Sequence, residues 1–143
     1  MRIGLYSATA RRDVTATMAF IAERGYGRSA DDIRRCRQEI ADFPDGTPQK
    51  QVTASWDFFS TSDCRDLLFH VQQQGLTIPA IKEFLHANGL EFLGFELDAR
   101  VLRTYEMRFP DDPAWTNLDL WDVFESENPD VFTDMYVFLV QKR

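Results

Sequence analysis

The run Met135-Tyr136-Val137-Phe138-Leu139-Val140, close to the end of the chain, is apolar at every position. Its length and its aromatic and β-branched residues are typical of a strand. A strand without polar alternation is usually buried on both faces, as in the interior of a sheet that helices cover. We therefore expect an α/β fold whose closing strand lies inside the sheet.

Two earlier segments also have strand composition. Leu90 to Leu97 follows a helix directly, and its residues Leu93, Phe95 and Leu97 alternate onto one face. Ile3 to Tyr6 is short and begins almost at the first residue, with no polar segment before it. We therefore expect the chain to start in the middle of a fold.

Helical periodicity and capping residues predict four helices between these first two strands. They cover about residues 10–24, about 30–42, the segment from Cys64 to Val71 after cap candidates at 60–62, and 77–88. Two more helices are expected within 99–109 and 118–127. Three strands with about six helices make a lopsided α/β protein, so either the sheet is unusually small or further strands are missing.

The composition indicates the size of the domain and the kinds of ligand that its charge would attract. The 143 residues are 44% apolar and 27% charged, which suits one domain, residues 1–143, with its own core. The net charge of −7 gives no general attraction to nucleic acid or to anionic lipid. Residues 1–50 hold nine basic and seven acidic side chains, whereas the rest hold seven basic and sixteen acidic. An anionic ligand would therefore meet the first third of the chain.

The chain has neither a run long enough to span a membrane nor a secretory leader at its start. We expect a cytoplasmic protein without membrane association. Cys36 and Cys64 both fall in expected helices, and we interpret them as buried, reduced thiols.

Motifs for catalysis or cofactor binding are weak. Gly25-Tyr26-Gly27 follows a helix rather than a strand, so it indicates a helix stop and not a nucleotide-binding turn. The histidines His70 and His86 have no Cys or carboxylate neighbours at zinc-site spacing, and no glycine-X-serine-X-glycine elbow supports a hydrolase. The carboxylates of residues 106–134 are interpreted as a solvated surface, because metal sites need carboxylates that converge.

The best candidates for substrate contacts lie in two places. One is the end of the first strand, and the other is the cluster of arginines at 11–12 and 34–37. Ligands of open α/β sheets bind beyond the carboxyl ends of strands. The alternative for the arginines is a surface ion-pair network with nearby aspartates, and the alternative for His70 is capping of a helix end. The candidates are Tyr6, Ser7, Arg11, Arg34, Arg35 and His70.

Several segments together resemble one family. They are Ile3 to Ser7 with Ala10-Arg11, Asp32 to Arg37, Phe58 to His70, Leu90 to Glu96, and Glu125 to Pro129 with Met135-Tyr136. They resemble the C-terminal end of bacterial proteins that join tetratricopeptide repeats to a class I S-adenosylmethionine-dependent methyltransferase domain. The likeness spans nearly the whole chain, and its longest block is residues 58–70.

The resemblance implies a Rossmann-like sheet of which this chain holds the last three strands. In that family a parallel fifth strand and a sixth strand flank an antiparallel seventh. Ile3 to Tyr6 then corresponds to the fifth, Leu90 to Leu97 to the sixth and Met135 to Val140 to the seventh. The helices between the first two strands form a helical insertion of about residues 8–88.

The family's glycine-rich loop and its acidic ribose contact have no counterpart in this sequence, so no cofactor-binding residue is carried over. S-adenosylmethionine is expected for the complete family domain, and none for this chain alone, because half a cleft cannot align the reacting atoms. The expected function is the substrate side of a methyltransferase, with the missing N-terminal half or a second copy as partner. The alternative is a non-catalytic interaction module that associates through an exposed sheet edge.

Overall fold

A computed structural model describes residues 1–70 and 75–143. The chain divides into two compact units, which we treat one at a time. Residues 1–10 and 74–143 form a sheet unit, and residues 11–73 form a helical unit. The expected helical insertion of about residues 8–88 thus contains the whole helical unit and also one helix that belongs to the sheet unit.

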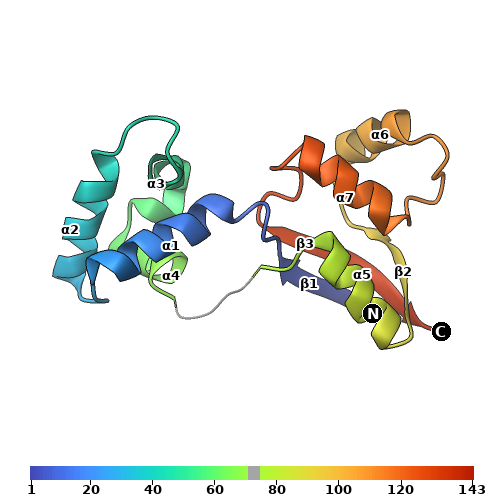
Figure 1. Cartoon of the computed structure of the whole chain (residues 1–143), viewed down its shortest axis with the longest axis horizontal. Coiled ribbons are helices and arrows are strands. Elements are labelled where there is room, and N and C mark those ends of the chain that lie inside the picture. The colour runs from blue at the N-terminus through green and yellow to red at the C-terminus, as the bar shows by residue number, and fades with distance from the viewer. Residues whose placement is uncertain (71–74) are drawn as a thin grey trace. The chain divides into compact units, whose positions relative to one another are not determined.

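The sheet unit contains three strands, β1 (Arg2–Tyr6), β2 (Leu90–Phe95) and β3 (Met135–Lys142). Their order is β1-β3-β2, and β3 is antiparallel to both neighbours (Figure 1). The strands β1 and β2 therefore run parallel to each other. This confirms that the closing strand is interior and antiparallel.

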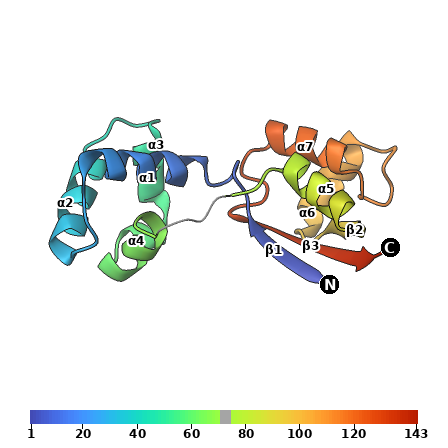
Figure 2. The same cartoon turned by 60° about the horizontal axis from the view of Figure 1, so that its bottom comes forward.

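Three helices belong to the same unit: α5 (Ile78–Ala87), α6 (Ala99–Arg108) and α7 (Leu118–Glu127). Each begins at a side chain that caps its first turn, namely Thr77, Asp98 and Asn117. All three helices share one core with buried strand residues, including Phe138 of β3. The helices therefore cover one face of the sheet (Figure 2).

The opposite face of the sheet is open, which corrects the expectation that β3 is buried on both sides. Tyr136, Phe138 and Val140 are fully buried, whereas Met135 and Leu139, which point to the other face, are 36% and 39% exposed. All five residues are apolar, so the hydropathy pattern alone could not show that only one face is covered.

The predicted alternation of Leu93, Phe95 and Leu97 in the second strand is also wrong. The buried residues of β2 are Phe92 and Phe95, and Leu93 is 43% exposed. The strand register shifts between Phe92 and Gly94, whose φ is +138°. This bulge breaks the period of two on which the prediction rested.

The helical unit contains α1 (Arg12–Arg24), α2 (Ala30–Ala41), α3 (Pro48–Gln51), two 3₁₀ turns (Val52–Ala54 and Trp56–Phe58) and α4 (Thr61–Leu68). The three longer helices match expected segments, and Val71 of the third lies outside the described residues. Helix α3 and the 3₁₀ turns were not predicted from the sequence, because single turns carry no periodicity.

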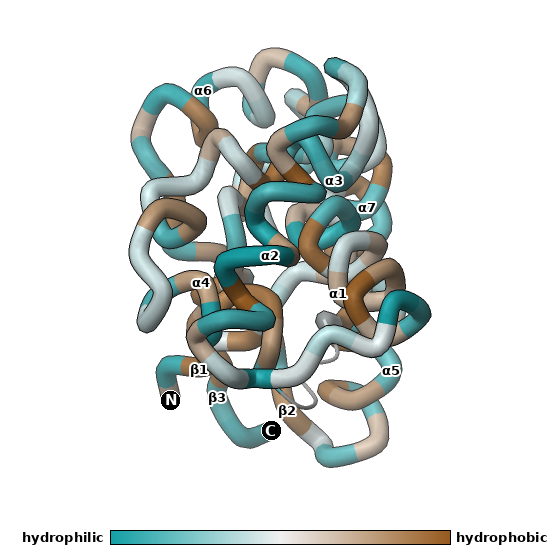
Figure 3. The backbone as a smooth tube through the Cα atoms, turned by 90° about the vertical axis from the view of Figure 1, so that its left-hand side faces the viewer, coloured by the Kyte–Doolittle hydropathy of each residue, from teal (hydrophilic) through white to brown (hydrophobic). Residues whose placement is uncertain are grey.

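The helical unit has its own apolar core. Helix α2 is mostly hydrophilic (Figure 3). It contributes to this core through one stripe of residues, Ile33, Cys36 and Ile40, which recur at helical spacing and are fully buried. Within residues 1–70 and 75–143, no helix is both long and apolar enough to cross a bilayer.

Both cysteines are free thiols in this core and are fully buried, as expected. Burial raises the pKa of Cys36 to about 12 and that of Cys64 to about 11. The thiolate is the form that reacts with alkylating agents. We therefore expect iodoacetamide to modify neither cysteine in the native protein at pH 8 and both in urea, as measured by mass spectrometry. Fast native modification would contradict this packing.

Candidate functional site at the carboxyl edge of the sheet

Because β1 and β2 are parallel, their carboxyl ends lie at the same edge of the sheet, where β3 begins. Ser7 follows β1 directly, and the segment from Glu96 to Asp98 follows β2. This is the edge at which open α/β sheets bind ligands. The edge holds a buried polar cluster and an open pocket.

The buried cluster is centred on Glu125 of α7. The Ser7 hydroxyl donates a hydrogen bond to Glu125 Oε1 at 2.8 Å, and the Tyr136 hydroxyl lies 2.9 Å from each carboxyl oxygen. Ser7 and Tyr136 are fully buried and Glu125 is 2% exposed. One carboxyl group thus joins the end of β1, helix α7 and strand β3.

Burial raises the pKa of Glu125, and the hydrogen bonds from Ser7 and Tyr136 oppose that rise. Burial likewise raises the pKa of the Tyr136 hydroxyl, so this group stays protonated and able to donate. A raised carboxyl pKa is common at functional sites. Here the cluster is closed to solvent, so it positions the sheet edge rather than contacting a ligand.

The backbone around Ser7 is fixed as well. The Ala10 amide donates to Ser7 Oγ at 3.0 Å, and the Ser7 amide donates to the Asp134 carbonyl at 2.9 Å. On the other side, Leu76 forms a parallel bridge with Ser7. The Ser7 hydroxyl is therefore held by one donated and one accepted hydrogen bond in a place that is closed to solvent.

The prediction that Glu125 is a solvated surface carboxylate is wrong, because Glu125 is buried. It was also wrong for Asp112, which is 8% exposed and accepts a hydrogen bond from the Tyr105 hydroxyl at 2.7 Å. A signal for Glu125 was present, because it follows the buried residues Leu118 and Trp121 at intervals of seven and four. That spacing places it on the apolar face of α7.

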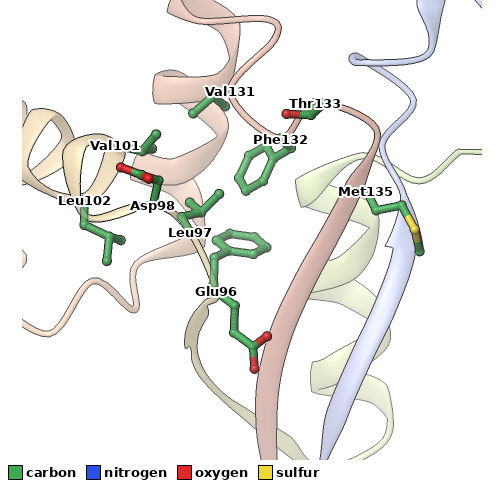
Figure 4. Close-up of a pocket in the computed structure, with 10 residues that line it drawn as sticks. Glu96, Leu97, Asp98, Val101, Leu102, Val131, Phe132, Thr133 and Met135 are labelled. Carbon is green, nitrogen blue, oxygen red and sulfur yellow. The ribbon is translucent and has the colours of Figure 1, made fainter. Parts of the chain in front are cut away.

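A pocket of about 740 Å³ lies beyond the carboxyl end of β2 (Figure 4). Its walls come from the end of β2, the start of α6 and the turn before β3. The lining residues are Phe95, Glu96, Leu97, Asp98, Val101, Leu102, Val131, Phe132, Thr133 and Met135. Most of them are apolar, and the only charged groups are two carboxylates.

The candidate residues from the sequence fall into different units. Tyr6 and Ser7 belong to the sheet unit, whereas Arg11, Arg34, Arg35 and His70 belong to the helical unit. Arg11 is 7% exposed. His70 is exposed just after α4.

Arg34 and Arg35 form ion pairs with Asp31 and Asp32, one turn earlier on α2. These pairs match the surface network that the sequence left open as the alternative. No residue of the pocket was predicted from the sequence, because its lining combines two segments, 95–102 and 131–135, that no shared motif connects.

Comparison of the sequence with models of known protein families and with curated proteins gives no match. In the part of the chain that the structure describes, no three His, Cys, Asp or Glu side chains are grouped so as to hold a metal ion. The geometry of the carboxyl edge is therefore the basis for assigning a function.

Proposed function

We propose that this chain is the substrate-side, C-terminal portion of a class I S-adenosylmethionine-dependent methyltransferase and is inactive in isolation. The strand order β1-β3-β2, with β3 antiparallel to both neighbours, carries the proposal. It is the arrangement of the last three strands in that family, and the segments that resemble the family supply these strands.

The carboxyl edge supports the same proposal. The cluster of Ser7, Glu125 and Tyr136 holds the end of β1 rigid, and a pocket opens beyond β2 on the same edge. Methyl transfer depends on alignment of acceptor and methyl donor, so a rigid edge beside a pocket suits the acceptor side of a cleft.

Two measurements test the proposal. Calorimetric titration of the isolated chain with S-adenosylmethionine is expected to give no binding in the micromolar range, and micromolar binding would contradict it. The DNA directly upstream of the Met1 codon is expected to encode a glycine-rich strand-turn-helix. An unrelated upstream gene would count against a methyltransferase origin.

A non-catalytic interaction module is the second candidate, and the open face of the sheet favours it. Leu93, Met135 and Leu139 are 43%, 36% and 39% exposed on neighbouring strands. The backbone groups of Arg2 and Gly4 that point away from β3 also form an edge to which another strand can bind.

The methyltransferase candidate predicts that the isolated chain self-associates through this surface, because an incomplete sheet exposes an edge and a face, whereas a stable monomer would favour a self-contained module. We expect light scattering after gel filtration to show dimers or larger species that increase with protein concentration. Leu139→Lys places a charge on the open face and is expected to shift the protein toward monomer. The matched control, Val123→Lys, changes an exposed apolar residue of α7 and should leave association unchanged. A wild-type chain that stays monomeric would show that the open face is not adhesive.

A further inference from the structure

We propose that the pocket beyond β2 binds a small organic cation, in which an ammonium group is attached to an aromatic or aliphatic body. This inference rests on the pocket alone and holds whether or not the chain belongs to a methyltransferase.

The pocket has the size and the surface that such a body needs. Its volume of about 740 Å³ lies within the range of small-molecule sites, roughly 300–1,000 Å³. Phe95 and Phe132 line it with ring centroids 4.7 Å apart, and Val101 and Val131 add aliphatic side chains to the lining. Aromatic rings attract cations as well as apolar groups.

The charges around the pocket favour a positively charged ligand. Its ten lining residues include Glu96 and Asp98 but no Lys, Arg or His. The sheet unit as a whole carries seven basic and thirteen acidic side chains. An anion would enter against this field without a basic partner in the lining, whereas a cation is attracted by it.

Asp98 is the carboxylate best placed to meet the cation. Glu96 already accepts a hydrogen bond from Arg2 Nε at 2.8 Å, and its carboxylate points away from the apolar side chains around Phe132 (Figure 4). The carboxylate of Asp98 points toward Val101. Its Oδ1 accepts a hydrogen bond from the Arg100 amide at 2.8 Å and forms only a long ion pair, 3.9 Å, with Nε of the highly exposed Arg100, whereas Glu96 is held by the 2.8 Å pair with Arg2.

The turn that closes the pocket is held in a strained conformation. Thr133 has a φ of +60°, which is rare for a β-branched residue. The Thr133 amide donates to the Asp130 carbonyl at 3.0 Å, and the Asp134 amide donates to the Phe132 carbonyl at 2.7 Å. Strain of this kind persists where surrounding bonds fix it, and it is frequent in ligand-binding turns.

The test uses three probes of similar shape: 2-phenylethylammonium, 2-phenylethanol and 3-phenylpropionate. The full chain is titrated with each, and amide shifts are followed by NMR. We expect the ammonium probe to bind with a Kd on the order of 1 mM and to shift the Val101 and Thr133 amides. The carboxylate probe should bind at least about fivefold more weakly, a modest ratio because Asp98 is partly solvated.

Asp98→Asn provides the matched variant. Asp98 caps α6 by accepting a hydrogen bond from the Arg100 amide at 2.8 Å, and asparagine caps helices equally well. The variant should keep its fold and its affinity for 2-phenylethanol but lose most of the preference for the ammonium probe. Glu83→Gln removes an exposed charge from α5 and serves as the control, with the preference retained.

Three outcomes would overturn the proposal. They are equal or tighter binding of 3-phenylpropionate, shifts confined to residues away from the pocket, and a preference that Asp98→Asn leaves intact. Absence of binding by all three probes at 20-fold excess over about 1 mM would also exclude a small-molecule site here.

Discussion

Replacement of Glu125 by alanine is expected to lower the free energy of unfolding of the sheet unit by about 3 kcal/mol. The substitution leaves the buried hydroxyls of Ser7 and Tyr136 without their acceptor. It also leaves a cavity between α7 and β3. Relief of the desolvation that raises the Glu125 pKa offsets part of this loss. Urea unfolding followed by tryptophan fluorescence measures the change.

The control for this prediction is Glu127→Ala, two residues further along α7. Glu127 is exposed and pairs with Arg108 at 2.9 Å, so its loss should change stability little. A second check is the coupling of Glu125 to Tyr136. Tyr136→Phe should destabilise the wild-type protein but have a smaller effect in the Glu125→Ala background. Equal stability of wild type and Glu125→Ala would show that the cluster does not hold the edge.

The burial of Glu125 also predicts how the free energy of unfolding depends on pH. The pKa of Glu125 is raised in the folded protein, so the folded state binds this proton more tightly than the unfolded chain does. The contribution of Glu125 to stability is therefore most favourable at or below the unfolded pKa of about 4.3. It declines as pH rises through the folded pKa. Glu125→Gln removes the titrating group, so the stability of this variant relative to wild type should increase over that range.

The positions of the three strands could be predicted from strong local signals in the sequence. Their order was predicted from the family resemblance. The unbroken apolar run from Met135 to Val140 indicates a strand, and Thr77 and Asn88 mark the ends of α5. The pattern could not distinguish the buried Phe138 from the exposed Leu139, because their exposure depends on helices that are distant in sequence. Such information exists only in tertiary packing.

The candidate site was harder to predict than the fold for a related reason. Ser7 was selected from its place after a strand, and the structure shows it at that edge with a buried, structural role. Glu125 was missed because a carboxylate is usually solvated, and only its spacing along α7 indicated burial. The pocket residues come from positions 95–102 and 131–135, and no local motif links these two segments.

The second large effect is expected at Gly75, where the chain returns to the sheet. A Cβ atom on Gly75 would lie 2.6 Å from both Cα and N of Ala8. Both atoms belong to the backbone, so no side-chain rotation can relieve the clash. Gly75→Ala must therefore move Leu76 away from the end of β1. In the wild-type protein the Leu76 amide donates to the Tyr6 carbonyl at 2.8 Å, and the Ala8 amide donates to the Leu76 carbonyl at 2.9 Å.

We expect Gly75→Ala to destabilise the sheet unit by about 3 kcal/mol and to abolish hydrogen-exchange protection of the Ala8 and Leu76 amides. Protection of the Cys36 amide should be unchanged, because residues 11–73 have their own core. Gly89→Ala is the matched control. Gly89 has a φ of +62° with nothing within 4 Å of its Cβ position, so alanine there adds backbone strain of about 1 kcal/mol without a clash. If the two variants behaved alike, the tight contact between Gly75 and the end of β1 would not be what fixes this edge of the sheet.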